Sequence, residues 1–232
     1  MKFSLSFLLL FTLTSAFSCR NGQNHGNSYG LKIISDVDEY LVTVSLNPDN
    51  QMVDLSTFVD GIFLDIRYAT KNNFTGEQIY DSPQAFARRP VAEALKKVSQ
   101  ELNMYGLGIK VFDAYRPYAA TVKFYEVMQG DTNFVAAPWK GSRHNRGCAV
   151  DVTLININTG IELAMPTEFD DFSEKAAVEY AGLPEDVLKN RQLLIDIMTK
   201  HGFDTYPWEW WHYDFKGWEK FEVLDIQFAL LD

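Results

Sequence analysis

Residues 148–157 read Cys-Ala-Val-Asp-Val-Thr-Leu-Ile-Asn-Ile, and this run constrains the fold more than any other segment of the chain. Its β-branched side chains favour a strand over a helix, and its apolar character predicts that the strand is buried. The run also carries one carboxylate, Asp151. Burial of a carboxylate is costly unless something positive lies beside it, and a metal ion would meet that need.

The rest of the chain is expected to alternate between strands and helices. Further strands are expected at residues 63–70, 108–114 and 206–215, and a turn at 158–160 leads into a short extended segment. Helices are expected at residues 85–102, 117–128 and 184–200, where apolar residues recur at helical spacing or a proline opens the segment. The pattern predicts an α+β fold, with a single domain over residues 54–232 and a mainly antiparallel central sheet covered by helices.

The N-terminus has the features of an export signal. Lys2 is followed by an uncharged, largely apolar run that ends at Phe17, and this run is shorter than the roughly twenty residues that span a bilayer. Residues 1–18 are therefore expected to form a signal peptide. Small residues at 16 and 18 precede Cys19, as in a loose bacterial lipobox, so Cys19 is expected to be lipidated; ordinary cleavage before an unmodified cysteine is the alternative.

Residues 19–53 are expected to form this lipidated N-terminus and a flexible tether, because residues 20–30 are polar and rich in Gly and Asn. The mature protein would be exported to the periplasm or cell envelope as a membrane-anchored lipoprotein. Its contact with the membrane would then be limited to the N-terminal lipid.

Charge and cysteine content exclude several classes of site. The 21 Lys and Arg residues against 31 Asp and Glu residues leave a net charge of −10, which argues against nucleic acid as a partner. The chain has two cysteines, too few for a Cys₄ zinc module or a cysteine-ligated iron–sulfur cluster. A metal site must therefore use histidine and carboxylate ligands.

His144 and Asp151 are the first candidate ligands. His144 lies in a polar, Gly-bounded loop that runs directly into the strand carrying Asp151. Residues seven apart on a regular strand face opposite ways, so the two can meet only if the chain turns between them, as Gly147 would permit. Taken alone, the pair could equally be a His–Asp hydrogen bond of no catalytic importance.

A second motif favours the catalytic interpretation. His212 lies in Trp-Glu-Trp-Trp-His-Tyr, where aromatic residues surround one histidine and one glutamate, Glu209. Two histidines, one aspartate and an open position are typical of a catalytic zinc site. Aromatic burial would raise the pKa of Glu209 and suit it to proton transfer, provided that Glu209 lies at an irregular strand entry after Pro207.

These motifs resemble a known family. Ser142-x-His-x-x-Gly-x-Ala-x-Asp151 and Glu209-x-x-His212 are similar to the zinc D-alanyl-D-alanine dipeptidases of the VanX type, a group related to zinc D,D-carboxypeptidases and to the Hedgehog zinc-binding domain. Tyr68-Ala-Thr-x-x-Asn-Phe-Thr-Gly and Asp-Ala-Tyr-Arg116-Pro extend the resemblance over about residues 54–215.

The resemblance implies a role for each matching residue. It assigns one zinc ion per chain to His144, Asp151 and His212, and it makes Glu209 the general base. Arg116 would stabilise the transition state, although a structural ion pair beside the proline turn is the alternative. Asp170 would bind the substrate ammonium, with Asp171 as a competing alignment. Ser142 and Tyr68 would line the substrate pocket.

The implied activity is hydrolysis of D-Ala-D-Ala, or of a similar short D-amino-acid dipeptide, by metal-activated water. A D,D-carboxypeptidase acting on longer wall peptides and a non-catalytic zinc-binding module are the alternatives. Two departures from the family pattern stand out: the segment between Arg116 and Ser142 is shorter, which could open the pocket, and Cys148 stands beside the metal loop. Cys148 is expected to be a small packed thiol, with a metal-bound or nucleophilic thiolate as the alternative.

Overall fold

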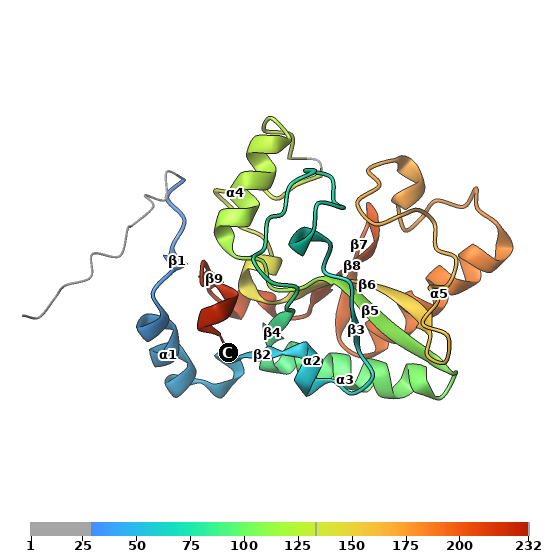
Figure 1. The fold of residues 1–232 in the computed structure, drawn as a ribbon, viewed down its shortest axis with the longest axis horizontal. Coiled ribbons are helices and arrows are strands. Elements are labelled where there is room, and N and C mark those ends of the chain that lie inside the picture. Colours follow the sequence, from blue (N-terminus) through green and yellow to red (C-terminus); the bar gives the residue numbers. More distant parts are fainter. Residues whose placement is uncertain (1–28, 133, 232) are drawn as a thin grey trace, which may run out of the picture.

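The computed structural model describes residues 29–132 and 134–231 (Figure 1). The expected signal peptide and Cys19 lie outside the described residues. Within the described part of the chain, no helix is both long enough and apolar enough to cross a membrane.

A five-stranded sheet forms the centre of the fold, in the order β3-β5-β6-β8-β7. Its strands are β3 (Phe63–Leu64), β5 (Leu107–Asp113), β6 (Ala149–Asn156), β8 (Glu209–Phe215) and β7 (Phe203–Tyr206). Within this sheet β3 and β5 pair in parallel, and the other three pairings are antiparallel. β6 is the middle strand, and seven of its eight residues are buried. The predicted strand and the mainly antiparallel α+β fold are confirmed.

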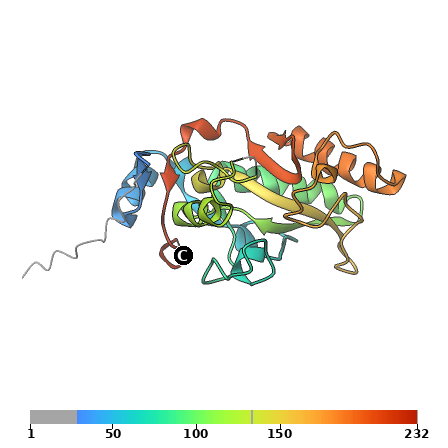
Figure 2. The same cartoon turned by 90° about the horizontal axis from the view of Figure 1, so that it is seen from above.

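Two long helices cover one face of this sheet. α3 (Arg89–Asn103) packs on β5 and α5 (Glu185–Lys200) packs on β6 and β7, and the two helices also contact each other (Figures 1 and 2). The buried side chains of α3 recur at helical spacing, as in Val91, Leu95, Val98 and Leu102. Two further helices, α2 (Leu55–Phe58) and α4 (Tyr118–Val127), flank strand ends, and α4 follows Pro117 as predicted.

Three predicted elements differ from expectation. The strand expected at 206–215 is divided, because β7 ends at Tyr206 and β8 begins at Glu209. The strand expected at 63–70 ends at Leu64, and a short 3₁₀ helix, Arg67–Ala69, follows it. The helix expected from residue 85 begins at Arg89, because residues Phe86–Arg88 form β4, which pairs antiparallel with β2 (Met52–Asp54). A proline in the first turn of α3 is compatible with a helix start but not with its interior, which places the boundary here.

The expected boundary of the domain at residue 54 is wrong. β1 (Ile33–Ile34) pairs in parallel with β9 (Val223–Leu224), and α1 (Val37–Leu46) follows it. Tyr40 of α1 is buried, and its hydroxyl accepts a hydrogen bond from the backbone N–H of Met52 at 2.7 Å. Residues from Ile33 onward are therefore part of the folded unit and not of a tether. The sequence does not show this, because the strand that pairs with β1 lies near the opposite end of the chain.

Candidate metal centre and active site

The loop that precedes β6 makes the turn that the sequence requires. His144–Arg146 form a single 3₁₀ turn, and Gly147 ends it with a left-handed φ of 68°. A Cβ atom at Gly147 would lie 2.7 Å from Cε of Met52 and 3.3 Å from the backbone N of Arg88. Glycine is therefore needed for conformation and for space. The turn brings His144 back over Asp151.

The register of the sheet places the third candidate ligand. Asp151 of β6 and His212 of β8 are directly paired, and residues paired across antiparallel strands project their side chains to the same face. Nδ1 of His212 lies 3.0 Å from Oδ1 of Asp151. Residues far apart in the chain thus meet at one point of the sheet.

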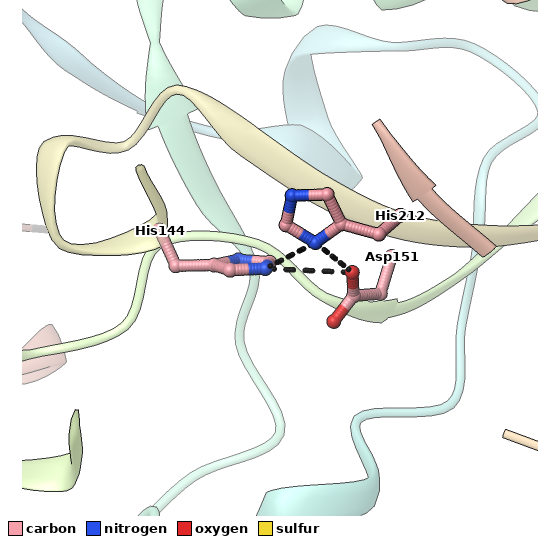
Figure 3. Close-up of side chains that lie close together, drawn as sticks. All are labelled: His144, Asp151 and His212. Carbon is pink, nitrogen blue, oxygen red and sulfur yellow. Dashed lines mark hydrogen bonds and ion pairs between the residues drawn. The ribbon is translucent and has the colours of Figure 1, made fainter. Parts of the chain in front are cut away.

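Three ligand atoms converge, as Figure 3 shows. Nε2 of His144 lies 3.2 Å from Nδ1 of His212 and 3.4 Å from Oδ1 of Asp151. Tetrahedral zinc with bonds of about 2.0–2.1 Å separates its ligand atoms by roughly 3.3–3.4 Å. The three side chains are buried and could hold a metal ion. The structure therefore brings the three predicted ligands together, and the identity of the ion stays a prediction.

The outer nitrogen of each histidine is bound to an acceptor. Nδ1 of His144 donates to the carbonyl of Ala114 at 2.7 Å, and Nε2 of His212 lies 3.0 Å from Oδ1 of Asp214. A neutral imidazole that donates through one nitrogen presents a lone pair on the other. Both rings are thus oriented with an acceptor nitrogen toward the cluster.

Asp214, which contacts the outer nitrogen of His212, was not predicted from the sequence. The signal was present, because residues two apart on a strand share a face and Asp214 follows His212 at that spacing. Asn145 was missed as well. This buried amide donates to the carbonyl of Arg116 at 2.9 Å and accepts from the N–H of Ser142 at 2.7 Å, so it ties the metal loop to the arginine. No local pattern indicated that contact.

Glu209 lies beside the cluster, with Oε2 at 3.7 Å from Nδ1 of His212. It is the first residue of β8, and the pairing of β7 with β8 shifts register between Thr205 and Tyr206, so the predicted irregularity is present. The shift allows Glu209 and His212, which are three residues apart on β8, to face the same cavity. Burial raises the pKa of Glu209 to about 7, although nearby His212 acts in the opposite direction.

The position of Arg116 is compatible with both of its expected roles, stabilisation of the transition state and a structural ion pair. Its Nε and Nη2 donate to the same oxygen of Asp113, at 3.0 and 2.7 Å, so it is a structural ion pair. Nη2 also lies 3.9 Å from Oδ2 of Asp151, and the side chain lines the cavity at the cluster. The ring of Phe124 packs against the guanidinium, whose carbon is 4.8 Å from the ring centre. Nη1 takes no part in the ion pair with Asp113.

Asp170 and Tyr68 meet on the cavity wall. The Tyr68 hydroxyl donates to Oδ1 of Asp170 at 3.0 Å, whereas Oδ2 is buried without a hydrogen-bond partner. Burial, together with the charge of Asp151, raises the pKa of Asp170 to about 8. Asp171 instead accepts from the N–H of Ser173 at 2.8 Å, so Asp170 is the aspartate that faces the cavity.

Ser142 and Cys148 flank the metal loop in different ways. Ser142 lines the cavity, and its Oγ accepts from the N–H of His144 at 3.2 Å, so it also supports the loop. Cys148 is fully buried, its thiol lies 3.5 Å from the carbonyl of Arg146, and burial raises its pKa to about 12. Cys148 is therefore a packed thiol, and among the described residues it is not part of the metal-ligand cluster.

One cavity of about 430 Å³ joins these residues. Its lining includes the three candidate ligands together with Glu209, Arg116, Asp170, Tyr68 and Ser142. Each site residue that the sequence predicted within the described chain thus opens onto the same space. The space is concave and lined by both charged and aromatic side chains, and it is large enough for a small peptide.

Comparison with known proteins places the chain in a family. A family model described as D-ala-D-ala dipeptidase, Peptidase_M15, matches residues 48–223. The D-alanyl-D-alanine dipeptidase of Escherichia coli (strain K12) is 30% identical over 184 residues, which cover 79% of this chain and 94% of that relative. The enzyme of the same name from Enterococcus faecium is 32% identical over 178 residues, covering 68% and 88%. The chain therefore belongs to the M15 peptidase family of D-Ala-D-Ala dipeptidases.

Proposed function

We propose that this protein is a zinc-dependent dipeptidase that hydrolyses D-Ala-D-Ala or a similar short D-amino-acid dipeptide. The observation that carries the proposal is the shared cavity. It holds three converging ligand atoms, a buried carboxylate suited to proton transfer and a second buried carboxylate with an unpaired oxygen. The names of the M15 relatives support the choice of substrate.

The donor set fits one zinc ion. Two imidazole nitrogens and one carboxylate oxygen, with an open fourth position, are typical of catalytic zinc. His144, Asp151 and His212 would hold the ion, and the hydrogen bonds of the two imidazoles to Ala114 and Asp214 orient the rings for that purpose. When bound, zinc supplies a Lewis acid that polarises a carbonyl and lowers the pKa of water.

Glu209 would carry the proton. As a carboxylate beside the cluster, it accepts a proton from the attacking water, and its raised pKa allows it to retain that proton and then donate it to the leaving amine. Arg116 donates hydrogen bonds to the carbonyl oxygen as negative charge develops there, held in position by Asp113. Oδ2 of Asp170 accepts from the substrate ammonium, which supplies the positive partner that this buried oxygen lacks.

The test is hydrolysis by the zinc-loaded protein. It is expected to release free D-Ala from D-Ala-D-Ala, and Glu209→Gln is expected to lower kcat by about 10²–10⁴-fold while zinc content is unchanged. Glu93→Gln, at an exposed position on α3, is the matched control. Full activity in Glu209→Gln would refute the mechanism.

A D,D-carboxypeptidase is the alternative substrate class, and the volume of the cavity would admit a longer peptide. The unpaired oxygen of Asp170 favours a free ammonium instead. Turnover of D-Ala-D-Ala against an N-acetylated D-Ala-D-Ala peptide separates the two, because an acylated amine has no charge to pair with Asp170. Faster cleavage of the acylated peptide would identify a carboxypeptidase.

We also propose export and lipidation at Cys19. The support is the uncharged run that ends at Phe17 and the small residues that precede the cysteine. The mass of the mature protein from its native host tests this, since lipidation adds a diacylglycerol at Cys19 and Cys19→Ala removes it. An unmodified N-terminus at Cys19 would leave a secreted protein without an anchor.

A further inference from the structure

Arg143 is a cation on the wall of the same cavity that the proposed reaction does not use. It immediately precedes His144, and its side chain lines the cavity at a side-chain exposure of 42%. Its Nε is buried without a hydrogen-bond partner. It forms a long ion pair with Asp214, whose Oδ2 lies 3.6 Å from Nε, beyond hydrogen-bond distance.

The guanidinium of Arg143 is held in place by stacking. Its central carbon lies 4.8 Å from the ring centre of Trp218, and Arg146 packs against the same ring at 5.4 Å. Arg146 is in turn tied to the carbonyl of Phe221. Stacking on an aromatic ring orients a guanidinium and reduces the entropy lost when it binds a planar anion. The arrangement favours recognition of a carboxylate.

Arg143 and Asp170 are connected to different ligands of the metal cluster. Asp170 is joined through Tyr68 and Arg116 to Asp151, whereas Arg143 is joined through Asp214 to the outer nitrogen of His212. The outer nitrogen of His212 points away from the cluster, so the Asp214 carboxylate and Arg143 lie beyond that ring. The cavity thus has a carboxylate oxygen without a hydrogen-bond partner in one part and a guanidinium nitrogen without one in another.

We propose that Arg143 binds the free C-terminal carboxylate of the substrate and so restricts the enzyme to peptides that end one residue after the cleaved bond. The inference rests on the proposed function and deepens it. Arg116 is less suited to this task, since its Nε and Nη2 are occupied by Asp113. A short peptide with both termini free offers an ammonium to the Asp170 oxygen and a carboxylate to the Arg143 nitrogen that have no hydrogen-bond partner.

The competing explanation is that Arg143 only neutralises Asp214 and so acts through His212. The two explanations differ in what they predict for a substrate without a terminal charge. Loss of carboxylate recognition affects D-Ala-D-Ala and spares its C-terminal amide. Disturbance of His212 lowers the hydrolysis of both and also weakens metal binding.

The experiment compares D-Ala-D-Ala with D-alanyl-D-alaninamide in the zinc-loaded natural protein and in Arg143→Gln. The natural protein is expected to prefer the free acid. Arg143→Gln is expected to lose about 10- to 100-fold in kcat/KM for the acid, mainly through KM, with little change for the amide. Arg143→Lys keeps the charge, so its kcat/KM for the acid is expected to lie between those of the natural protein and of Arg143→Gln. Lys216→Gln, which removes an exposed cation from the turn after β8, is the control.

A binding measurement keeps the inference separate from the proposed function. Calorimetric titration of both peptides into zinc-loaded Glu209→Gln, with and without Arg143→Gln, reports recognition without turnover. If the natural protein hydrolyses neither peptide but binding of the acid still depends on Arg143, the proposed function fails and the inference stands. An unchanged preference for acid over amide in Arg143→Gln, or an equal loss for both peptides, would overturn the inference.

Discussion

Asp214 lies 3.0 Å from the outer nitrogen of His212, on the side of the ring away from Asp151. The carboxylate fixes the ring orientation and makes the inner nitrogen a better ligand. Asp214→Asn is therefore expected to weaken metal affinity by about 10- to 100-fold. Competition with a chromogenic chelator measures this, with Asp204→Asn, an exposed residue paired with Lys216, as the control. Equal affinity in the two variants would show that Asp214 does not orient the ligand.

The raised pKa of Glu209 sets the direction of the pH dependence. Burial raises that pKa to about 7, and a cation at the cluster would lower it because it favours the carboxylate. The base must be deprotonated to accept a proton. We therefore expect kcat/KM to fall about tenfold per pH unit below a midpoint at or below pH 7. A kcat/KM that stays constant from about pH 5 to 8 would contradict this role.

Asp170 is expected to destabilise the metal-free fold at high pH. Its folded-state pKa of about 8 lies above the ordinary carboxyl value near 4, so the folded state loses stability as the pH rises between these values. Asn is an acceptable replacement at a φ of 62°, because short polar side chains tolerate this region. Asp170→Asn should raise the Tm of the metal-free protein at pH 9 and leave it nearly unchanged at pH 4. Asp171→Asn, at the neighbouring aspartate that does not line the cavity, is the matched variant measured in the same way.

Gly147, in the metal loop, and Gly160, in the turn after β6, are matched positions for a test by substitution. Both have a φ of 68°, but a Cβ at Gly160 would have open space, whereas one at Gly147 would meet Met52. Gly160→Ala is expected to cost about 1–2 kcal/mol of unfolding free energy from the left-handed backbone alone. Gly147→Ala should cost more and should also weaken metal binding, because His144 must shift. Denaturant titration with chelator competition measures both. Equal costs would mean that Met52 gives way freely.

Cys148 distinguishes a metallopeptidase from a cysteine peptidase. The thiol is fully buried, and its pKa is raised to about 12, so it is a poor nucleophile in the native protein. Iodoacetamide at pH 8 should leave Cys148 unmodified and activity intact, whereas a chelator should abolish activity and added zinc should restore it. Peptide mapping of the native and the guanidinium-unfolded protein checks the labelling. Loss of activity on alkylation of the native protein would revive the cysteine nucleophile.

Local patterns predicted most of the regular elements. The alternation around Asp151 predicted β6, and the helical spacing of apolar residues predicted the body of α3 and α5. The errors arise where pairing with another segment of the chain decides the secondary structure. β4 forms because β2 lies beside it, and β1 and α1 are ordered by contacts with β9 and with Met52. Such contacts join distant parts of the chain and leave no local periodicity.

The sequence by itself determined the chemistry of the site: two histidines and one aspartate able to bind a metal, a glutamate in aromatic surroundings, and a glycine where the loop must turn. The tertiary structure decided the geometry. It paired Asp151 with His212, added Asp214 behind the ring, chose Asp170 over Asp171, and placed Arg143 on the cavity wall. The physical reason is strand register. A shift of one residue between β6 and β8 would put Asp151 and His212 on opposite faces of the sheet, and register depends on the packing of the whole sheet.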